Sequence, residues 1–228
     1  MVQDKHWKLS PSDFAFLWEE CKRCFYLKVV KGFSRPQAPM PKIFMVIDGQ
    51  METFFSGMRT EKIAAGLPEG IIQYGEKWVE SKTISTPNCS STCFIKGKFD
   101  TIAKFKDGSY GVIDFKTSAR NSEHIPLYSR QLHAYAYTLE NAAPGKLSLS
   151  PINRLGLLIY EPSFFSSSNM KSLSLEGNLL WLEITRDDHE FETFIREVLL
   201  ILDQPTPPNS NPNCKWCQYR DKSRQTSF

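Results

Sequence analysis

Residues 93–117 constrain the fold of this 228-residue chain more than any other segment. Polar and apolar residues alternate along 93–105 and again along 111–117, which is the period of half-buried β-strands. Between these two runs, Gly108 can adopt the left-handed conformation that a three-residue hairpin loop requires. We therefore expect an antiparallel hairpin closed by the loop Lys106–Gly108.

The loop length decides which side chains face one another across this hairpin. Asp114 and Lys116 are two residues apart on one strand, so they share a face. A three-residue loop places Asp100 opposite Asp114 and Lys98 opposite Lys116. A two-residue turn would instead place Asp100 opposite Phe115, on the wrong face, unless a β-bulge in either strand restored the alignment.

Two facing carboxylates repel each other across a sheet, and a divalent cation between them would offset that repulsion. Oxygen ligands suit Mg²⁺, which binds few protein carboxylates and keeps several waters. A lysine beside such a metal, here Lys116, can orient or deprotonate an attacking water and stabilise charge on a phosphate. The tripeptide D-x-K alone is common and is more often a solvated strand face. The ordered set G-x-x-D, turn, I-D-F-K-T and helix is much rarer.

This ordered set resembles the RecB-like branch of the PD-(D/E)XK nuclease superfamily, which includes the CRISPR-associated exonucleases. The resemblance implies an α/β, restriction-endonuclease-like fold, with a central mixed sheet flanked by helices. It also implies hydrolysis of DNA with Mg²⁺ or Mn²⁺. In that family the matching residues Asp100 and Asp114 bind the metal and Lys116 supports hydrolysis. The family's Q-x-x-x-Y motif is matched by Gln131 and Tyr135 on the next helix, and positions i and i+4 share a helix face.

The chain departs from the family pattern on the upstream helix. Family members usually carry a histidine there, whereas FMVIDGQMETFF places Asp48 at that position and Glu52 four residues later. Aspartate also binds hard cations, so we include Asp48 among the expected metal ligands. A solvated helix face is the alternative interpretation of Asp48.

Two C-x-x-C pairs, Cys21/Cys24 and Cys214/Cys217, enclose nearly the whole chain. Four thiols in this pattern indicate a metal centre in a reducing compartment, and both zinc and an iron–sulfur cluster accept four thiolates. The family resemblance implies a [4Fe–4S] cluster, with zinc as the alternative. Its members use one N-terminal and three C-terminal cysteines, whereas this chain would use two and two.

The remaining cysteines, Cys89 and Cys93, are not needed as ligands, and we expect free or buried thiols. We expect one domain over residues 1–228, with cluster-binding segments 10–31 and 205–220 and a nuclease core 43–204. The patterns predict helices and strands in the following places: helices at 10–31 (Ser10 as N-cap, Pro11 first), 43–55, 122–141 (capped by Ser122) and 189–204; strands at 75–84, 154–162 and 179–185; a surface loop at 164–172.

Composition narrows the functional classes only slightly. The net charge of +3 and pI of about 8.5 are compatible with a polyanionic partner but are weak evidence. No apolar run could span a membrane and no secretory signal is evident, so we expect a cytoplasmic protein. No G-x-x-x-x-G-K loop is present, so any helicase must be a partner.

The function expected from these observations is a deoxyribonuclease, more specifically an exonuclease, that acts on single-stranded or free-ended DNA. A CRISPR or DNA-repair complex is a candidate setting. The alternatives are a catalytically inactive nucleic-acid-binding or assembly factor with the same fold, and a zinc-stapled scaffold that binds partners.

Overall fold

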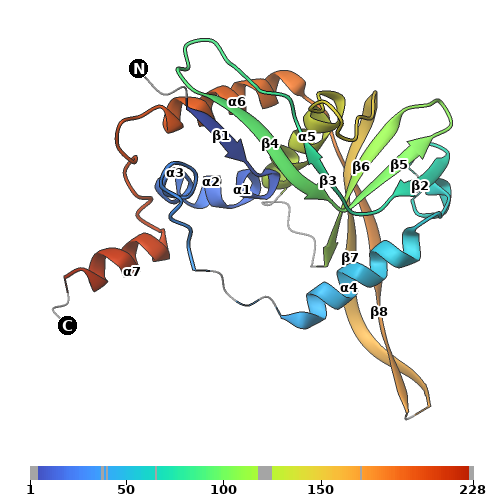
Figure 1. The fold of residues 1–228 in the computed structure, drawn as a ribbon. Helices are drawn as coiled ribbons and strands as arrows, with labels where there is room; N and C mark the ends of the chain where they lie inside the picture. The colour runs from blue at the N-terminus through green and yellow to red at the C-terminus, as the bar shows by residue number, and fades with distance from the viewer. Residues whose placement is uncertain are drawn as a thin grey trace.

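The computed structural model describes residues 5–36, 39, 41–64, 66–117, 125–169 and 171–225 (Figure 1). The strands are β1 (His6–Leu9), β2 (Gly70–Tyr74), β3 (Lys77–Glu80), β4 (Thr92–Phe99), β5 (Thr101–Phe105), β6 (Tyr110–Thr117), β7 (Ile152–Asn169) and β8 (Ser172–Ile184). The helices are α1 (Pro11–Ala15), α2 (Leu17–Glu20), α3 (Lys22–Lys31), α4 (Lys42–Phe55), the 3-10 turn η1 (Thr60–Lys62), α5 (Ile125–Glu140), α6 (Asp188–Leu202) and α7 (Lys215–Ser223).

The strands form a curled mixed sheet in two parts. The larger part has the order β2-β5-β6-β7-β8, and the smaller part has the order β1-β4-β3. One of the crossings between the two parts is a single residue, Asp100, which separates β4 from β5. The strands β6 and β7 are parallel and are joined through α5, whereas β5 pairs with β6 and β7 with β8 in antiparallel fashion.

Helices cover both faces of β6. Val112 belongs to a core under α5, together with Leu132 and Ala136 of that helix. The next residue, Ile113, points to the opposite face and packs in a core that contains Met51 of α4. Alternation along β6 therefore carries Asp114 to the α5 side, as the period of a strand requires.

A second core joins the N-terminal helices to the smaller part of the sheet. Trp18 of α2 makes edge-on ring contacts with Phe25 of α3 and Phe194 of α6, with centroid separations of 5.1 and 5.6 Å. Leu9 of β1 and Ile95 of β4 are buried in the same core. These aromatic contacts fix the helices α2 and α3, which carry Cys21 and Cys24, against the sheet.

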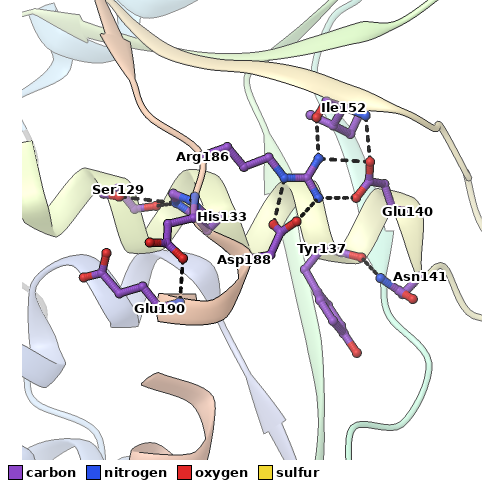
Figure 2. A network of polar contacts seen from close by, with 10 residues as sticks. Ser129, His133, Tyr137, Glu140, Asn141, Ile152, Arg186, Asp188 and Glu190 are labelled. Atoms are coloured by element: carbon purple, nitrogen blue, oxygen red, sulfur yellow. Dashed lines mark hydrogen bonds and ion pairs between the residues drawn. The ribbon is translucent and has the colours of Figure 1, made fainter. Parts of the chain in front are cut away.

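Buried polar contacts hold α5 in place (Figure 2). His133 Nε2 accepts a hydrogen bond from the backbone N–H of Asp187 at 2.8 Å, so its Nδ1 donates to the carbonyl of Ser129, also at 2.8 Å. Arg186 donates to both carboxylate oxygens of Glu140 at the end of α5. The start of α6 and the end of β8 are thus fixed to α5, the helix that carries Gln131 and Tyr135.

Residues 10–31 do not form the single helix that we predicted. The helix breaks at Phe16 and again at Cys21, whose backbone is extended at φ −168° and ψ 105°. Pro11 is the first helical residue, as expected, but Ser10 makes no capping hydrogen bond and its hydroxyl contacts that of Ser12. The break orients Cys21 and Cys24 toward one site.

Two other predictions about the elements also need correction. The predicted strand 93–105 is two strands, because the chain bends at Asp100. The predicted loop 164–172 is wrong, since β7 extends to Asn169 and pairs with β8 in a ribbon that projects from the molecule (Figure 1). The strands β1 and β2 were not predicted. The expected cap Ser122 lies outside the described residues. No helix in the described part of the chain is both long and apolar enough to cross a bilayer.

Candidate active site and cysteine centre

The hairpin closes with the predicted three-residue loop. The backbone N–H of Phe105 donates to the carbonyl of Ser109 at 2.8 Å, and Gly108 has a φ of 86°. Thr101 pairs with Ile113, so the residue before it, Asp100, lies opposite the residue after Ile113, which is Asp114. The predicted alignment of the two carboxylates is confirmed.

The same alignment does not extend to Lys98. Because the chain bends at Asp100, Lys98 belongs to β4 and pairs with Trp78 of β3, and the prediction that it faces Lys116 is wrong. The bend leaves the backbone N–H of Phe115 free to donate to Asp100 Oδ2 at 2.9 Å. Asp100 is therefore held at the junction of the two parts of the sheet.

The charged groups of the site are closely coupled. Asp114 is only 2% exposed and forms an ion pair with Lys116. Gln131 Nε2 of α5 donates to Asp114 Oδ1 at 3.2 Å. Burial and the adjacent charge of Asp114 raise the pKa of Asp100 to about 8. Burial would lower the pKa of Lys116, but the two carboxylates raise it, so the lysine remains charged.

Tyr135 supports the site through the backbone. Its hydroxyl donates to the carbonyl of Lys98 at 2.7 Å, two residues before Asp100. A Cβ on Gly97 would lie 3.2 Å from the Tyr135 ring and 2.7 Å from Pro11 Cδ, so only glycine allows this close packing. Tyr135 thus fixes the end of β4 from which Asp100 projects.

The two acidic residues of α4 have different surroundings. Asp48 is exposed and lines the same cleft as Asp100 and Asp114. Glu52, one turn later, instead accepts a hydrogen bond from the backbone N–H of Glu76 at 2.8 Å. Glu76 also lines the cleft and forms an ion pair with Lys98. Glu76 was missed from the sequence, because it belongs to no motif and the pairing of β3 with β4 brings it to the site.

These side chains converge on one open cleft of about 930 Å³. Its floor contains Asp100, Asp114, Lys116 and Gln131, and its walls come from α4 and from the smaller part of the sheet. Such a cleft offers carboxylate oxygens, an ammonium group and an amide at one place, which is the chemistry needed to bind a hard cation next to a phosphate.

Comparison with known protein families assigns this chain to one of them. The model of the PD-(D/E)XK nuclease superfamily matches residues 48–222, which include Asp48, Asp100 and Asp114 of this cleft. The chain belongs to this superfamily. Among solved structures, one similar to this nuclease-superfamily chain is the crystal structure of SSO0001, with 16% sequence identity and a TM-score of 0.50. The similarity covers 97% of this chain and 87% of SSO0001 and supports the fold alone. No curated protein is significantly similar to this chain.

This PD-(D/E)XK chain also contains a buried group of four cysteines: Cys21, Cys24, Cys214 and Cys217. Their sulfur atoms all lie within 4.8 Å of one another, and none forms a disulfide. The group joins the N-terminal helices to the segment that contains α7, as the sequence predicted. Cys93 is buried apart from them, and Cys89 is half-buried and contacts the carbonyl of Arg196.

The environment of the four cysteines affects their thiols unequally, lowering the pKa of Cys21 and raising that of Cys24 and Cys217. Burial would raise the pKa of the Cys21 thiol, but hydrogen bonds with the backbone of Asn211 and Cys24 lower it to about 7. Arg35 donates to Cys214 Sγ at 3.3 Å and places a positive charge beside the sulfurs. Burial raises the pKa of Cys217, so a cation is needed to hold all four sulfurs deprotonated together.

The spacing of the sulfurs suits one four-coordinate ion. The separations from Cys24 Sγ to Cys214 Sγ and to Cys217 Sγ are 3.7 and 3.6 Å, and Cys21 Sγ lies 3.8 Å from Cys217 Sγ. A tetrahedral zinc site with Zn–S bonds of about 2.3 Å has sulfurs about 3.8 Å apart. Each cysteine of a [4Fe–4S] cluster binds a separate iron, so that cluster requires a wider set of sulfurs.

Proposed function

We propose that this chain is a deoxyribonuclease that depends on Mg²⁺ or Mn²⁺. The observation that carries the proposal is the pair of facing carboxylates, Asp100 and Asp114, beside Lys116 on the floor of an open cleft. Membership of the PD-(D/E)XK superfamily supports an enzyme that hydrolyses phosphodiester bonds. DNA that is single-stranded or has free ends is the proposed substrate, and exonucleolytic cleavage is the proposed mode.

In this proposal, Asp100 and Asp114 hold the cation, and Asp48 contributes a third oxygen from α4. The raised pKa of Asp100 supports this cation site. It arises from burial and from the nearby charge of Asp114, which Lys116 balances only in part, and a bound cation would balance the rest. When bound, the cation supplies the charge that activates water and stabilises the phosphate oxygens. The oxygen-only ligand set matches the preference of Mg²⁺ and Mn²⁺.

The other residues act on water, on phosphate and on the carboxylates. Lys116 directs its ammonium group at the attacking water and the scissile phosphate. Gln131 fixes the orientation of Asp114 through their hydrogen bond, and Tyr135 fixes the backbone beside Asp100. In this arrangement, Lys116 is a catalytic residue. Gln131 lies beside the metal site and orients the ligand Asp114, and Tyr135 is a positioning residue.

Cleavage of end-labelled linear strands tests the proposal. The wild type, Asp114→Asn and Lys116→Ala are incubated with single-stranded DNA, duplex DNA and RNA in Mg²⁺ or Mn²⁺. We expect both variants to lose activity by about 100-fold or more. Asp107→Asn and Lys104→Ala are matched controls, because both residues lie on the same hairpin with exposed side chains. Circular single strands should resist cleavage if the enzyme requires an end.

Two outcomes would overturn this assignment. Equal cleavage by the wild type and Asp114→Asn would show that the activity belongs to a contaminant. Binding of DNA without cleavage in either cation would favour the alternative function, an inactive nucleic-acid-binding or assembly factor. A helicase, or a CRISPR or repair complex, remains the proposed class of partner, because a nuclease for single strands needs a source of unwound DNA.

For the four cysteines we propose a structural metal centre. The family resemblance supports a [4Fe–4S] cluster, whereas the sulfur separations support zinc. We give the separations more weight, because they are properties of this chain. Elemental analysis after anaerobic purification distinguishes the two. We expect one zinc per chain and no visible absorbance, and a brown preparation with four irons would overturn zinc.

A further inference from the structure

The smaller part of the sheet has one buried face and one open face. Alternate residues of β4, such as Ile95 and Phe99, point into the core. The residues between them point outward and are partly or fully exposed: Thr92, Phe94, Lys96 and Lys98. Pairing places His6 and Lys8 of β1 and Trp78 and Glu80 of β3 opposite these four residues, on the same open face.

Aromatic rings are exposed at both ends of this open face. The Trp78 side chain is 65% exposed, although indole is normally buried. On the far side of β4, the rings of His6 and Phe94 stack with a centroid separation of 5.1 Å and an angle of 21°. Exposed rings with free faces are the groups on which unpaired bases stack.

Lysines lie between these rings. The ammonium groups of Lys8, Lys96 and Lys98 share the face, and two of them form ion pairs: Lys96 with Glu80 at 2.8 Å and Lys98 with Glu76 at 2.5 Å. Exposed ion pairs of this kind contribute only about 0–1 kcal/mol, so a phosphate can replace either glutamate at little cost. The face therefore alternates aromatic and positively charged groups.

The face leads directly to the carboxylates. Asp100 follows the last residue of β4 in the chain. His6, Lys8, Trp78, Lys96 and Lys98 line the same cleft as Asp114 and Lys116. A strand laid along β4 would thus run from the aromatic face to the candidate active site without leaving the cleft.

We propose that the open face of β1-β4-β3 binds single-stranded nucleic acid and guides it to Asp100 and Asp114. Bases stack on Trp78 and on the His6–Phe94 pair, and phosphates contact Lys8, Lys96 and Lys98. A duplex presents no free base faces, so the face selects single strands. This inference deepens the proposed function and rests on it for the direction of the strand, but binding is measured separately from cleavage.

Fluorescence anisotropy with labelled oligo-dT and a matched duplex, without divalent cations, tests the proposal. We expect Trp78→Ala to weaken oligo-dT binding about tenfold and to leave duplex binding unchanged, since stacking contributes about 1–3 kcal/mol per base. Trp78→Phe should keep most of the affinity. Phe165→Ala is the control, because Phe165 is 68% exposed on the distant ribbon.

Salt dependence provides a second measurement. Replacing Lys8, Lys96 and Lys98 together by glutamine should reduce the slope of log affinity against log salt by about 2, since each phosphate contact contributes about 0.7 for a single strand. Oligo-dT binding unchanged in both Trp78→Ala and the triple variant would overturn the proposal even if the wild type cleaves DNA. Trp78-dependent binding without cleavage would support the face and contradict the nuclease.

Discussion

Asp100 shows how a residue suited to binding a cation can reduce the stability of the free protein. Its carboxylate is partly buried beside Asp114, and among the described residues the one backbone N–H that donates to it is that of Phe115. Lys116 forms its ion pair with Asp114 rather than with Asp100. The pKa of about 8 reflects how unfavourable the charged carboxylate is in this position.

Replacing Asp100 by asparagine should stabilise the cation-free protein. An aspartate in the unfolded chain titrates near a pKa of roughly 4, so the folded protein holds this proton more tightly. The stability from that proton is complete below pH 4 and is lost as pH rises through about 8. Asp100→Asn should therefore melt about 2–6 °C higher than the wild type at pH 8.5 and show little gain at pH 5.

Thermal denaturation after dialysis against Mg²⁺-free buffer measures this difference, and chelator is omitted so that the cysteine centre keeps its metal. Asp107→Asn controls for the loss of a charge on the same hairpin. A melting difference that did not grow with pH would contradict the raised pKa of Asp100. Cleavage by Asp100→Asn should be lost at every pH.

Cleavage at limiting Mg²⁺ should also depend on pH. Cation binding at Asp100 must displace its proton, so binding weakens as pH falls below about 8. We expect activity at low Mg²⁺ to rise steeply between pH 6 and about 8, and saturating Mg²⁺ to shift this rise to lower pH. Rate measurements over a grid of pH and Mg²⁺ concentration check this, and a midpoint independent of Mg²⁺ would contradict it.

At the scale of elements, local patterns predicted the hairpin but not its bend. The alternation along β6 and the glycine at position 108 are local features, and both are present as expected. The division of 93–105 at Asp100 depends on β3 and β1, which pair with β4 from other parts of the chain. The ribbon containing 164–172 was mistaken for a loop because serines are polar, although β8 pairs with it along its length.

The residues of the candidate site were also predicted only where a local pattern or a family motif marked them. Asp100, Asp114 and Lys116 emerged from strand period and loop length, whereas the roles of Gln131 and Tyr135 depended on resemblance to a family. Their catalytic roles remain predictions. Glu76 and Trp78 were missed because no local signal marks them, and only their pairing with β4 brings them to the cleft.

The packing of β4 against α1 and α5 depends on Gly97. A methyl group there would meet Pro11 and the Tyr135 ring at distances that require both to move, so Gly97→Ala should cost about 1–3 kcal/mol and also reduce activity. Gly49→Ala is the control, because nothing lies within 4 Å of its added methyl group and alanine favours helix α4. Urea denaturation measures both, and similar stabilities would contradict the packing.

At the scale of the whole molecule, the cysteine centre links segments that are distant in sequence. Hydrogen bonds between the same segments accompany the sulfurs: Arg23 donates to the carbonyl of Pro208 at 3.2 Å, Tyr26 to that of Gln204 at 2.9 Å, and Asn211 to that of Glu20 at 3.0 Å. We propose that the described elements unfold as one cooperative unit while metal is bound.

Removing the proposed metal should lower the melting temperature. It should also make different parts of the chain unfold in separate transitions. Cys217→Ser should have the same effect, whereas Cys89→Ser should not, because Cys89 lies outside the group. The transitions seen by tryptophan fluorescence, to which Trp18 and the other four tryptophans contribute, and by far-ultraviolet circular dichroism should coincide for the wild type and diverge for Cys217→Ser. Coincident transitions in both proteins would contradict a stapling role.

The distance in sequence between the two cysteine pairs also sets the order of events during synthesis. Cys21 and Cys24 leave the ribosome early, but Cys214 and Cys217 are made only after every strand of both parts of the sheet. The rest of the fold can thus begin to form before the last two cysteines are made, and the segment that contains α7 is fixed last. A shortage of the proposed metal would then leave chains whose cleft has formed but whose segment around α7 is loose and exposed to proteases.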